Sequence, residues 1–253
     1  MKPLDLDAVR DYVNNHIDEF HQSKIRSMET LKLKALLQRK NPYLFKSKNI
    51  LLAQDMVRTL PDAHISSSEE EMFGQFLEGL AIFIAGQTCD GVKSVRVGID
   101  LELVLRGMTM LVQIKSGPNW GNSTQQNKQE QNFRQAIEAV QLEQGPETKV
   151  EAILGICYGK TRTARLRGYL KVVGQNLWYL VSENEHLYTE IIEPLGYRAK
   201  EHTETFERQK AAVVNRFTQE FMSEFCDNGV INWERIVRFN SSNFDLPMFL
   251  SNE

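Results

Sequence analysis

The segment spanning residues 98–116 constrains the fold more than any other part of the chain. Two apolar runs alternate there with polar residues, and Arg106-Gly107 stands between them, so the segment predicts a β-hairpin. Asp100 lies near the start of the first strand, whereas Gln113 and Lys115 lie at the end of the second. Residues two apart in a strand share a face, so the side chains of Gln113 and Lys115 point the same way.

The pairing of the two strands brings these polar residues together. With the turn in that position, Asp100 falls roughly opposite Ile114. Gln113 and Lys115 then flank it across the ladder. A hard divalent cation takes oxygen ligands, which Asp100, the Gln113 side chain and the Ile114 backbone carbonyl can supply. The metal would polarise a phosphate and activate water, and Lys115 would hold that water and neutralise developing charge. The alternative is an exposed salt bridge on an ordinary hairpin, which the apolar flanks disfavour because buried polar groups need partners.

The motif formed by Asp100 and Gln113-Ile114-Lys115 resembles the active site of the PD-(D/E)XK nuclease superfamily, with Gln113 where an acid is usual. Three further segments, at 40–46, 115–122 and 177–196, look like those of bacterial type II restriction endonucleases. The resemblance implies a metal-dependent DNA endonuclease with one or two Mg²⁺ ions per active site. It also implies a short palindromic target in double-stranded DNA, a homodimer, and a cognate DNA methyltransferase as genetic partner.

A glutamate on the helix before the hairpin often reaches the metal in that superfamily. The sequence Gly74-x-x-x-Glu78 resembles that helix, so we expect Glu78 to be a catalytic and metal-binding residue. Glu71 is the rival on the same helix, and Glu102 is a further acid that can replace the charge missing at Gln113. The alternative for each is an exposed acid or a salt bridge at the edge of a strand.

The expected fold class is α/β (α+β), with a restriction-endonuclease-like core in which helices flank a central mixed sheet. We expect a single nuclease domain over residues 1–253, with a helical N-terminal part (1–65), a catalytic core (66–182) and a helical C-terminal part (183–253). A proline at position 61 ends one expected helix, and serines at 66–68 cap the next. The expected helices are at 5–21, 25–38, 47–60, 69–85, 123–143, 186–194, 203–226 and 230–238, the expected strands are at 93–105, 109–115 and 150–158, and a hairpin is expected at 168–182.

Two clusters of basic residues are candidates for DNA contact. The first lies between residues 32 and 48, where Lys40 and Lys46 accompany aromatic residues. The second lies between residues 160 and 171, and it includes Arg162, Arg165 and Arg167. No acid interrupts residues 160–167, and arginine binds both phosphates and base edges. The alternative for either cluster is a solvated face.

The turn-rich loop after Lys115 is a third candidate for DNA contact. Its glycines allow close approach of the backbone to a ligand. The loop residues that we expect to contact DNA are Ser116, Asn119, Trp120 and Asn122. The polar run at 122–134 contains glutamines and asparagines, which can bind adenine. The alternative is a structural turn before the next helix, with Ser123 as its N-cap.

Composition agrees with an intracellular enzyme and excludes several other classes. Hydrophobic residues make up 42% and charged residues 25%, and the net charge of −3 argues against a general nucleic-acid coat. The five histidines have no ligand spacing, so a zinc site or a histidine nucleophile has no support. We expect no signal peptide, no membrane partner and a cytoplasmic location. The remaining alternatives are a nuclease of the same fold for repair or phage defence, a DNA-binding protein without catalysis, and a nickase-like or RNA-directed enzyme.

Overall fold

The computed structural model describes residues 1–245. The chain divides into two compact units, each described by itself. The first unit contains residues 1–20 and 70–199, and the second contains residues 21–69 and the C-terminal part from residue 200. None of the helices in the described part of the chain is long and apolar enough to cross a membrane.

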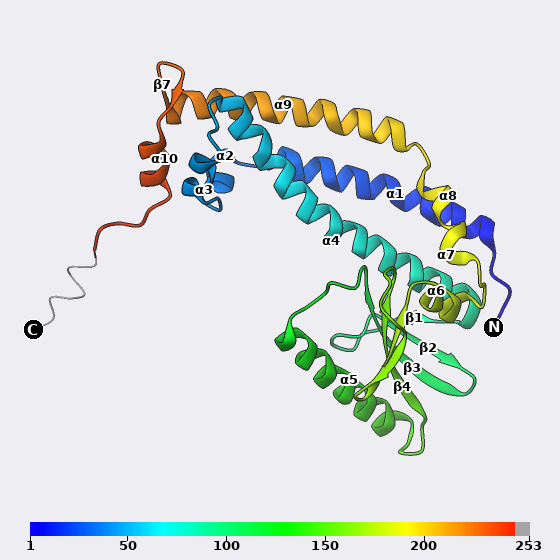
Figure 1. The fold of residues 1–253 in the computed structure, drawn as a ribbon. Helices are drawn as coiled ribbons and strands as arrows, with labels where there is room; N and C mark the ends of the chain where they lie inside the picture. Colours follow the sequence, from blue (N-terminus) through cyan, green and yellow to red (C-terminus); the bar gives the residue numbers. More distant parts are fainter. Residues whose placement is uncertain (246–253) are drawn as a thin grey trace, which may run out of the picture. The chain divides into compact units, whose positions relative to one another are not determined.

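The first unit is built on a six-stranded mixed sheet with the strand order β1-β2-β3-β4-β6-β5 (Figure 1). Strands β3 and β4 pair in parallel, as do β4 and β6, whereas β1–β2, β2–β3 and β5–β6 are antiparallel. Helices flank this sheet, so the expected α/β class with a central mixed sheet is confirmed. The strands are β1 (Val92–Lys93), β2 (Leu101–Leu105), β3 (Met108–Lys115), β4 (Val150–Ile156), β5 (Ala164–Leu166) and β6 (Tyr169–Val173). The helices are α5 (Ser123–Gln144), α6 (Gln175–Ser182), α7 (Leu187–Glu190) and α8 (Ile192–Leu195), with parts of α1 (Leu6–Glu29) and α4 (Ala53–Cys89).

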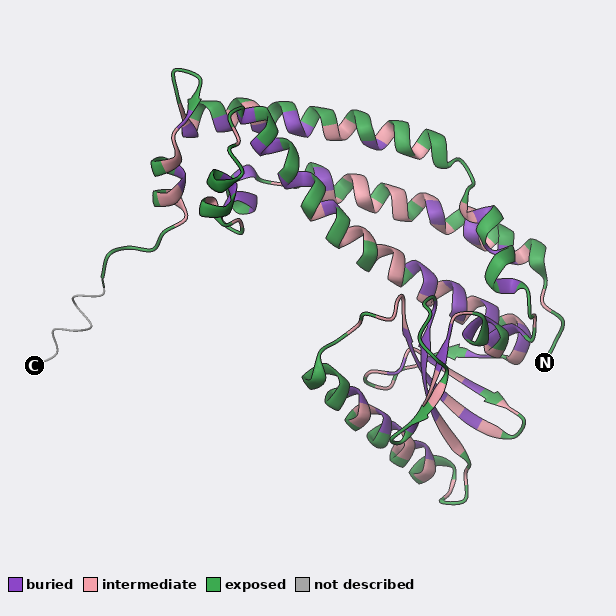
Figure 2. Ribbon diagram, viewed as in Figure 1, coloured by how far each residue is buried: buried purple, intermediate pink, exposed green. Residues whose placement is uncertain are grey.

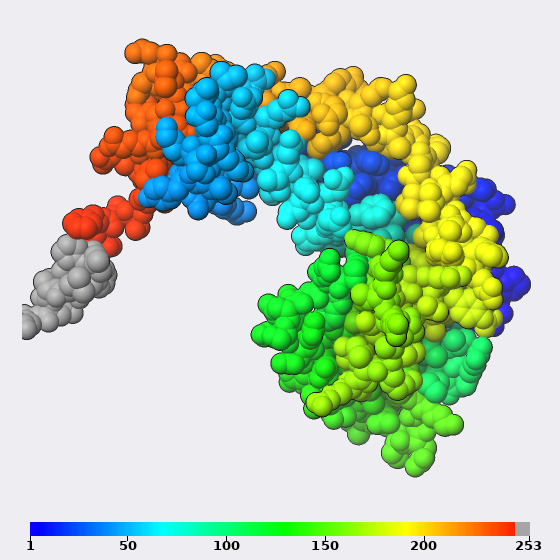
Figure 3. Space-filling view, viewed as in Figure 1, coloured from blue at the N-terminus to red at the C-terminus, as the bar shows by residue number. Residues whose placement is uncertain are grey.

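The two faces of the sheet are covered by different helices. Helix α5 packs Phe133 and Val140 against one face, which includes Leu111. Helix α4 packs Leu80 against the other face, which includes Val112. Figure 2 shows buried residues on the strands and on the inner sides of both helices, and the green segments form one packed body in Figure 3. Each fully buried aliphatic or aromatic side chain contributes about 1.5–3 kcal/mol, so the two layers hold β3 and its polar end in place.

The expected hairpin at 98–116 is confirmed, but its register differs from the expectation. Strands β2 and β3 are joined by Arg106 and Gly107, with φ of 52° and 72°, which is typical of a type I′ turn. Leu105 pairs directly with Met108 and Leu101 with Val112. Continuing this ladder places Asp100 opposite Gln113, not opposite Ile114. The expectation was wrong by one residue, because the two-residue turn pairs Leu105 directly with Met108 and so fixes the register of the whole ladder.

Helix α4 corrects the expected boundary at residue 61. It runs without interruption through Pro61 and through the serines at 66–68. Proline removes one backbone hydrogen bond, and in a helix interior this costs about 3 kcal/mol. Met56 and Leu60 are buried beside it, and their packing offsets that cost. Ser68 donates its hydroxyl back to His64 and Ile65 carbonyls rather than capping a new helix.

Three other expected boundaries are also wrong. Residues 94–100 form a loop within the expected strand 93–105, and the Ser94 N–H donates to the Asp100 carbonyl at 3.0 Å across it. Gly174, with φ of 57°, turns the chain from β6 into α6, so the expected hairpin at 168–182 is the β5–β6 hairpin followed by a helix. The helices expected at 5–21 and 25–38 are the continuous α1 followed by the short α2 (Leu33–Leu37).

The second unit is helical apart from one short hairpin. Its core includes Leu37, Leu60, Phe217 and Phe221, all almost fully buried. Its own elements are α2, α3 (Pro42–Ser47), α9 (Ala199–Phe225), β7 (Cys226–Asp227), β8 (Val230–Ile231) and α10 (Trp233–Phe239), and parts of α1 and α4 complete it.

Candidate active site

Asp100 stands immediately before β2 at the edge of the sheet where β3 ends. Its backbone N–H donates to the Val112 carbonyl at 2.9 Å, which fixes the residue in the ladder. Its Oδ2 accepts a hydrogen bond of 2.6 Å from the Ile114 N–H. Burial raises the pKa of the Asp100 carboxyl above its usual value, although this hydrogen bond and the charges of Lys115 and Lys93 oppose the rise. The carboxylate is therefore a partly desolvated group that gains by meeting a cation.

Glu78 reaches the same place from α4. Burial raises its pKa, the negative charge of Asp100 raises it further, and Lys93 and Lys115 lower it. Lys93 Nζ lies 3.9 Å from Glu78 Oε1. The structure thus brings Glu78, Asp100 and Lys115, from three different elements, into one electrostatic cluster. A carboxylate whose pKa is raised by burial and by a second carboxylate forms the arrangement that a divalent cation relieves.

The other two acids considered from the sequence lie elsewhere. Glu71 is exposed, two helical turns before Glu78 on α4. Glu102 accepts a hydrogen bond of 2.5 Å from the Ser94 hydroxyl, and its Oε1 lies 3.2 Å from Arg96 Nε. Glu102 therefore forms the salt bridge at the edge of a strand that was the alternative to a role at the metal.

Gln113 and Lys115 project from the end of β3 toward α5. Gln113 is only 9% exposed, and its Oε1 has no hydrogen-bond partner among the described residues. A buried acceptor without a partner costs about 1–3 kcal/mol, so this oxygen is available to a ligand that is not a protein atom. Lys115 Nζ lies 5.9 Å from the centroid of the Trp120 ring, within the range of a cation–π contact.

A cavity of about 280 Å³ opens beside these two residues. Its lining carries amide and ammonium groups but no carboxylate. The lining residues are Gln113, Lys115, Trp120, Gly121, Gln125, Lys128, Gln129 and Asn132. The site therefore combines acids at Asp100 and Glu78 with an amide-rich, cationic cavity, which suits a cation and a phosphate together.

The donors present fit a magnesium ion. Glu78 and Asp100 provide carboxylates, and Gln113 provides the unpartnered amide oxygen. These are the hard oxygen donors that Mg²⁺ prefers. Within residues 1–245 no group of three histidine, cysteine, aspartate or glutamate residues is placed to hold a metal, so an amide or backbone oxygen has to complete the site.

Three residues of the site were not singled out from the sequence. Lys93 belongs to the edge strand β1, and only its pairing with Leu101 places it beside the site. Cys157 follows β4, and burial together with the charge of Glu78 raises the pKa of its thiol to about 12. Gln129 lies on the buried face of α5. Each is brought to the site by tertiary pairing, for which the local sequence carries no pattern.

The loop at 116–122 is placed beside the site, and it has a structural role as well. Asn122 is the N-cap of α5, and it forms a capping box with Gln125, so Ser123 is not the N-cap. Trp120 packs near the Lys115 ammonium group, and Asn119 is exposed. A Cβ at Gly117 would lie 2.7 Å from the Tyr158 hydroxyl, so a larger residue there would have to displace the Tyr158 ring. Ser116 faces Gly74 of α4. A Cβ added at Gly74 would lie 3.3 Å from the Ser116 Cβ.

The arginines expected to contact DNA occupy three different environments. Arg162 is exposed in the loop after β4, at the edge of the sheet where β3 also ends. Arg165 makes a bidentate pair with Glu151, at 3.0 and 2.9 Å. Arg167 lies in the β5–β6 turn. Of these three arginines, Arg162 is therefore the one that follows the same end of the sheet as Lys115.

The basic candidates before residue 50 belong to the second unit. Lys46 on α3 lies 5.5 Å from the centroid of the Trp233 ring. Lys40 is half-buried just before α3, whose N-cap is Asn41. The role of both residues in DNA binding stays a prediction.

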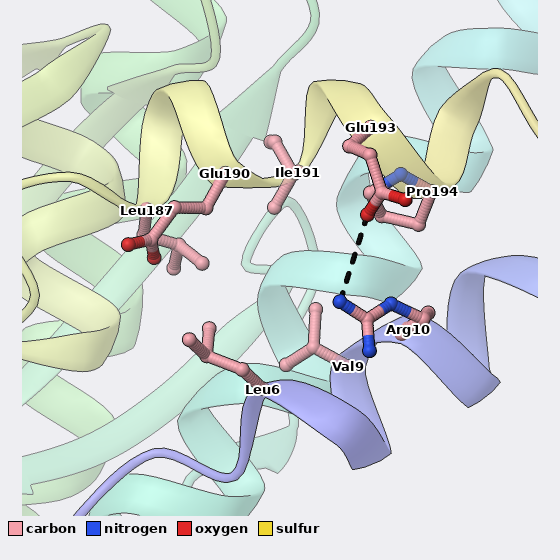
Figure 4. Close-up of a pocket in the computed structure, with 8 residues that line it drawn as sticks. All are labelled: Leu6, Val9, Arg10, Leu187, Glu190, Ile191, Glu193 and Pro194. Carbon is pink, nitrogen blue, oxygen red and sulfur yellow. Dashed lines mark ion pairs between the residues drawn. The ribbon is translucent and has the colours of Figure 1, made fainter.

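A different pocket in the first unit lies between α1, α7 and α8 (Figure 4). Leu6, Val9 and Ile191 line it, and Arg10 pairs across it with Glu193 at 3.6 Å. It contains none of the residues of the cluster around Asp100, so its chemistry does not contribute to that site.

Comparison with known protein families identifies the family of this chain. Residues 7–203 match the family model described as type II restriction endonuclease EcoO109I, which is well over half of the chain. No curated protein matches the chain.

Proposed function

Since the chain belongs to the type II restriction endonuclease family of EcoO109I, and is therefore a DNA endonuclease that binds DNA, we propose that it uses a PD-(D/E)XK-type site. In this proposal Asp100, Gln113, Lys115 and Glu78 catalyse Mg²⁺-dependent hydrolysis of phosphodiester bonds. The observation that carries the proposal is the convergence of Asp100, Glu78 and Lys115 beside the unpartnered oxygen of Gln113.

Asp100, Glu78, the Gln113 side chain and the Ile114 carbonyl would hold the ion. When bound, Mg²⁺ supplies Lewis-acid polarisation of the phosphate and a lowered pKa for water. The Ile114 N–H holds Asp100 in place through its 2.6 Å hydrogen bond to Oδ2, which leaves Oδ1 as the oxygen that would bind the ion. Whether one or two ions bind depends on how well the Gln113 amide substitutes for a carboxylate.

Lys115 has the role of orienting the attacking water and compensating the charge that develops on the phosphate. Its ammonium group is close enough to Asp100 and Glu78 to lower the pKa of both. It therefore also opposes the protonation of the two carboxylates that burial favours.

The target and the assembly follow from the chemistry of restriction. A short palindrome in double-stranded DNA has two-fold symmetry, and a homodimer matches that symmetry with one active site per strand. A cognate DNA methyltransferase is the expected genetic partner, because the host DNA carries the same short sequence. The pair would act on DNA in the cytoplasm.

Cleavage of phage and plasmid DNA tests the proposal. We expect discrete fragments in Mg²⁺ and none in EDTA. Asp100→Asn and Lys115→Ala should each reduce cleavage by at least about a hundredfold, because each removes a charge that acts on the transition state. Lys149→Ala is the matched control, since Lys149 is exposed at the opposite end of β4. Full activity in EDTA, or variants within tenfold of the parent, would contradict the proposed site. A smear in place of bands would indicate a nuclease without a short target.

A further inference from the structure

Gln129 is a buried amide that the proposed chemistry does not use. It is only 3% exposed and occupies the first position of the buried stripe of α5, which continues through Phe133, Ala136 and Val140. Both its Oε1 and its Nε2 are buried and have no hydrogen-bond partner among the described residues. An amide in such a position costs about 1–3 kcal/mol for each unpaired group, whereas an apolar residue would simply extend the stripe.

Gln129 lies beside the end of β3. Gln129 and Gln113 line the same cavity, together with Lys115. The next turn of α5 packs closely on the loop before Asp100, since Asn132 occupies the space where Gly98 would carry a Cβ. Helix α5 therefore presents Gln129 to the catalytic end of the sheet and not to solvent.

Glutamine at position 113 needs an orienting partner that an acid would not need. A carboxylate has two equivalent oxygens, so either can face a cation. An amide has one oxygen and one NH₂ group, and it binds a cation only when the oxygen is turned toward it. The Gln113 Oε1 is buried and unpartnered, so its orientation is not set by any hydrogen bond to that atom from the described residues.

We propose that Gln129 is a positioning residue that orients the Gln113 amide for metal binding. The Gln129 Oε1 accepts a hydrogen bond from the Gln113 Nε2, and this contact turns the Gln113 Oε1 toward the cation. The hydrogen bond is not formed between the two side chains in the structure, and the contact closes when the cation binds. This inference rests on the proposed metal site, and it adds a residue that touches neither the metal nor the DNA.

A double-mutant cycle measured by calorimetric titration of Ca²⁺ into the full-length protein tests this role without turnover. Gln129→Met keeps the length of the side chain and its helix propensity but removes the acceptor. We expect it to weaken Ca²⁺ binding about 10- to 100-fold, the usual effect of losing a partner that orients a ligand. In the Gln113→Glu background the same substitution should change the dissociation constant less than about twofold, because the carboxylate needs no orientation.

Two further variants separate orientation from packing. Gln129→Glu retains an acceptor, so it should bind Ca²⁺ at least as tightly as the parent. Gln131→Met changes an exposed glutamine two residues along α5 and should leave Ca²⁺ binding unchanged. Cleavage at saturating Mg²⁺ should recover toward the parent rate in Gln129→Met, because the substitution weakens the occupancy of the site and not the chemistry of the occupied site.

The outcomes distinguish this inference from the proposed function. Equal losses from Gln129→Met in both backgrounds would overturn the orienting role and make Gln129 a packing or DNA-contacting residue. Unchanged binding in Gln129→Met would overturn it as well. Absence of Ca²⁺ and Mg²⁺ binding by the parent protein would refute the metal site itself, and the role of Gln129 with it.

Discussion

The buried amide of Gln113 should lower the stability of the metal-free protein while being needed for DNA cleavage. Gln113→Leu replaces a buried amide, whose oxygen has no partner among the described residues, by an apolar side chain of similar volume. Leaving a buried acceptor unpaired costs about 1–3 kcal/mol. The Gln113 Nε2 is not among the buried unpartnered atoms, so only one end of the amide contributes and about 1–2 kcal/mol is the expected gain. The metal-free variant should be more stable than the parent, and it should not cleave DNA.

The gain corresponds to a rise in Tm of roughly 2–8 °C, because 1 kcal/mol shifts the Tm of a protein of this size by roughly 2–4 °C. Urea unfolding in EDTA is the assay, followed by tryptophan fluorescence. Trp120 and Trp178 belong to the first unit and Trp233 to the second, so Trp233→Phe restricts the signal to the unit that contains Gln113. Gln113→Glu is the matched comparison, and it should lose stability in EDTA because it adds a charge beside Asp100. A loss of 1 kcal/mol or more in Gln113→Leu would refute the reasoning, since it would mean that the amide is well paired.

Three other predictions concern pH, DNA contact and helix capping. Burial raises the folded-state pKa of Asp100 and Glu78 above the ordinary values of 3.8 and 4.5, so their stabilising contribution is complete below those values and is lost as pH rises through the folded pKa. Asp100→Asn should therefore match the metal-free parent in stability at acid pH and exceed it at neutral pH in urea titrations; a constant difference across that range would contradict this. Arg162→Ala should reduce the salt slope of DNA binding by about one unit, whereas Arg165→Ala should change it less because Glu151 already holds that guanidinium, and the opposite order would argue that the Arg165 pair opens on DNA. Asn122→Ala should cost about 1 kcal/mol of stability by removing the N-cap of α5, while Asn127→Ala on the exposed face of that helix should cost little, and equal effects would count against the capping box.

The sequence predicts the hairpin that carries the candidate site, although not its register or the start of its first strand, because its determinants are local. Alternating apolar residues and the turn at Arg106 and Gly107 define β2 and β3 without reference to the rest of the chain. The same local reasoning fails at Pro61, where burial of Met56 and Leu60 carries α4 past a residue that normally ends a helix. Local pattern therefore places α5, which was expected at 123–143, but tertiary burial decides the length of α4.

Residues of the candidate site divide in the same way. Gln113 and Lys115 lie on β3 and Asp100 immediately precedes β2, so their proximity follows from the hairpin alone. Gln129 is one of several polar residues in the first half of α5. Nothing in the sequence distinguishes it from Gln131, which is also a glutamine. Only the packing of α5 against the sheet buries one of the two and exposes the other.

The thiol of Cys157 has a consequence for the redox chemistry of the protein beside its acidic cluster. Burial and the charge of Glu78 raise its pKa to about 12, so the sulfur is held as the neutral thiol at neutral pH. The thiolate is the form that reacts with oxidants, so a cysteine in this environment is a poor target for peroxide. That low reactivity depends on the side chain remaining dry, because entry of water beside Cys157 would remove the main cause of its raised pKa.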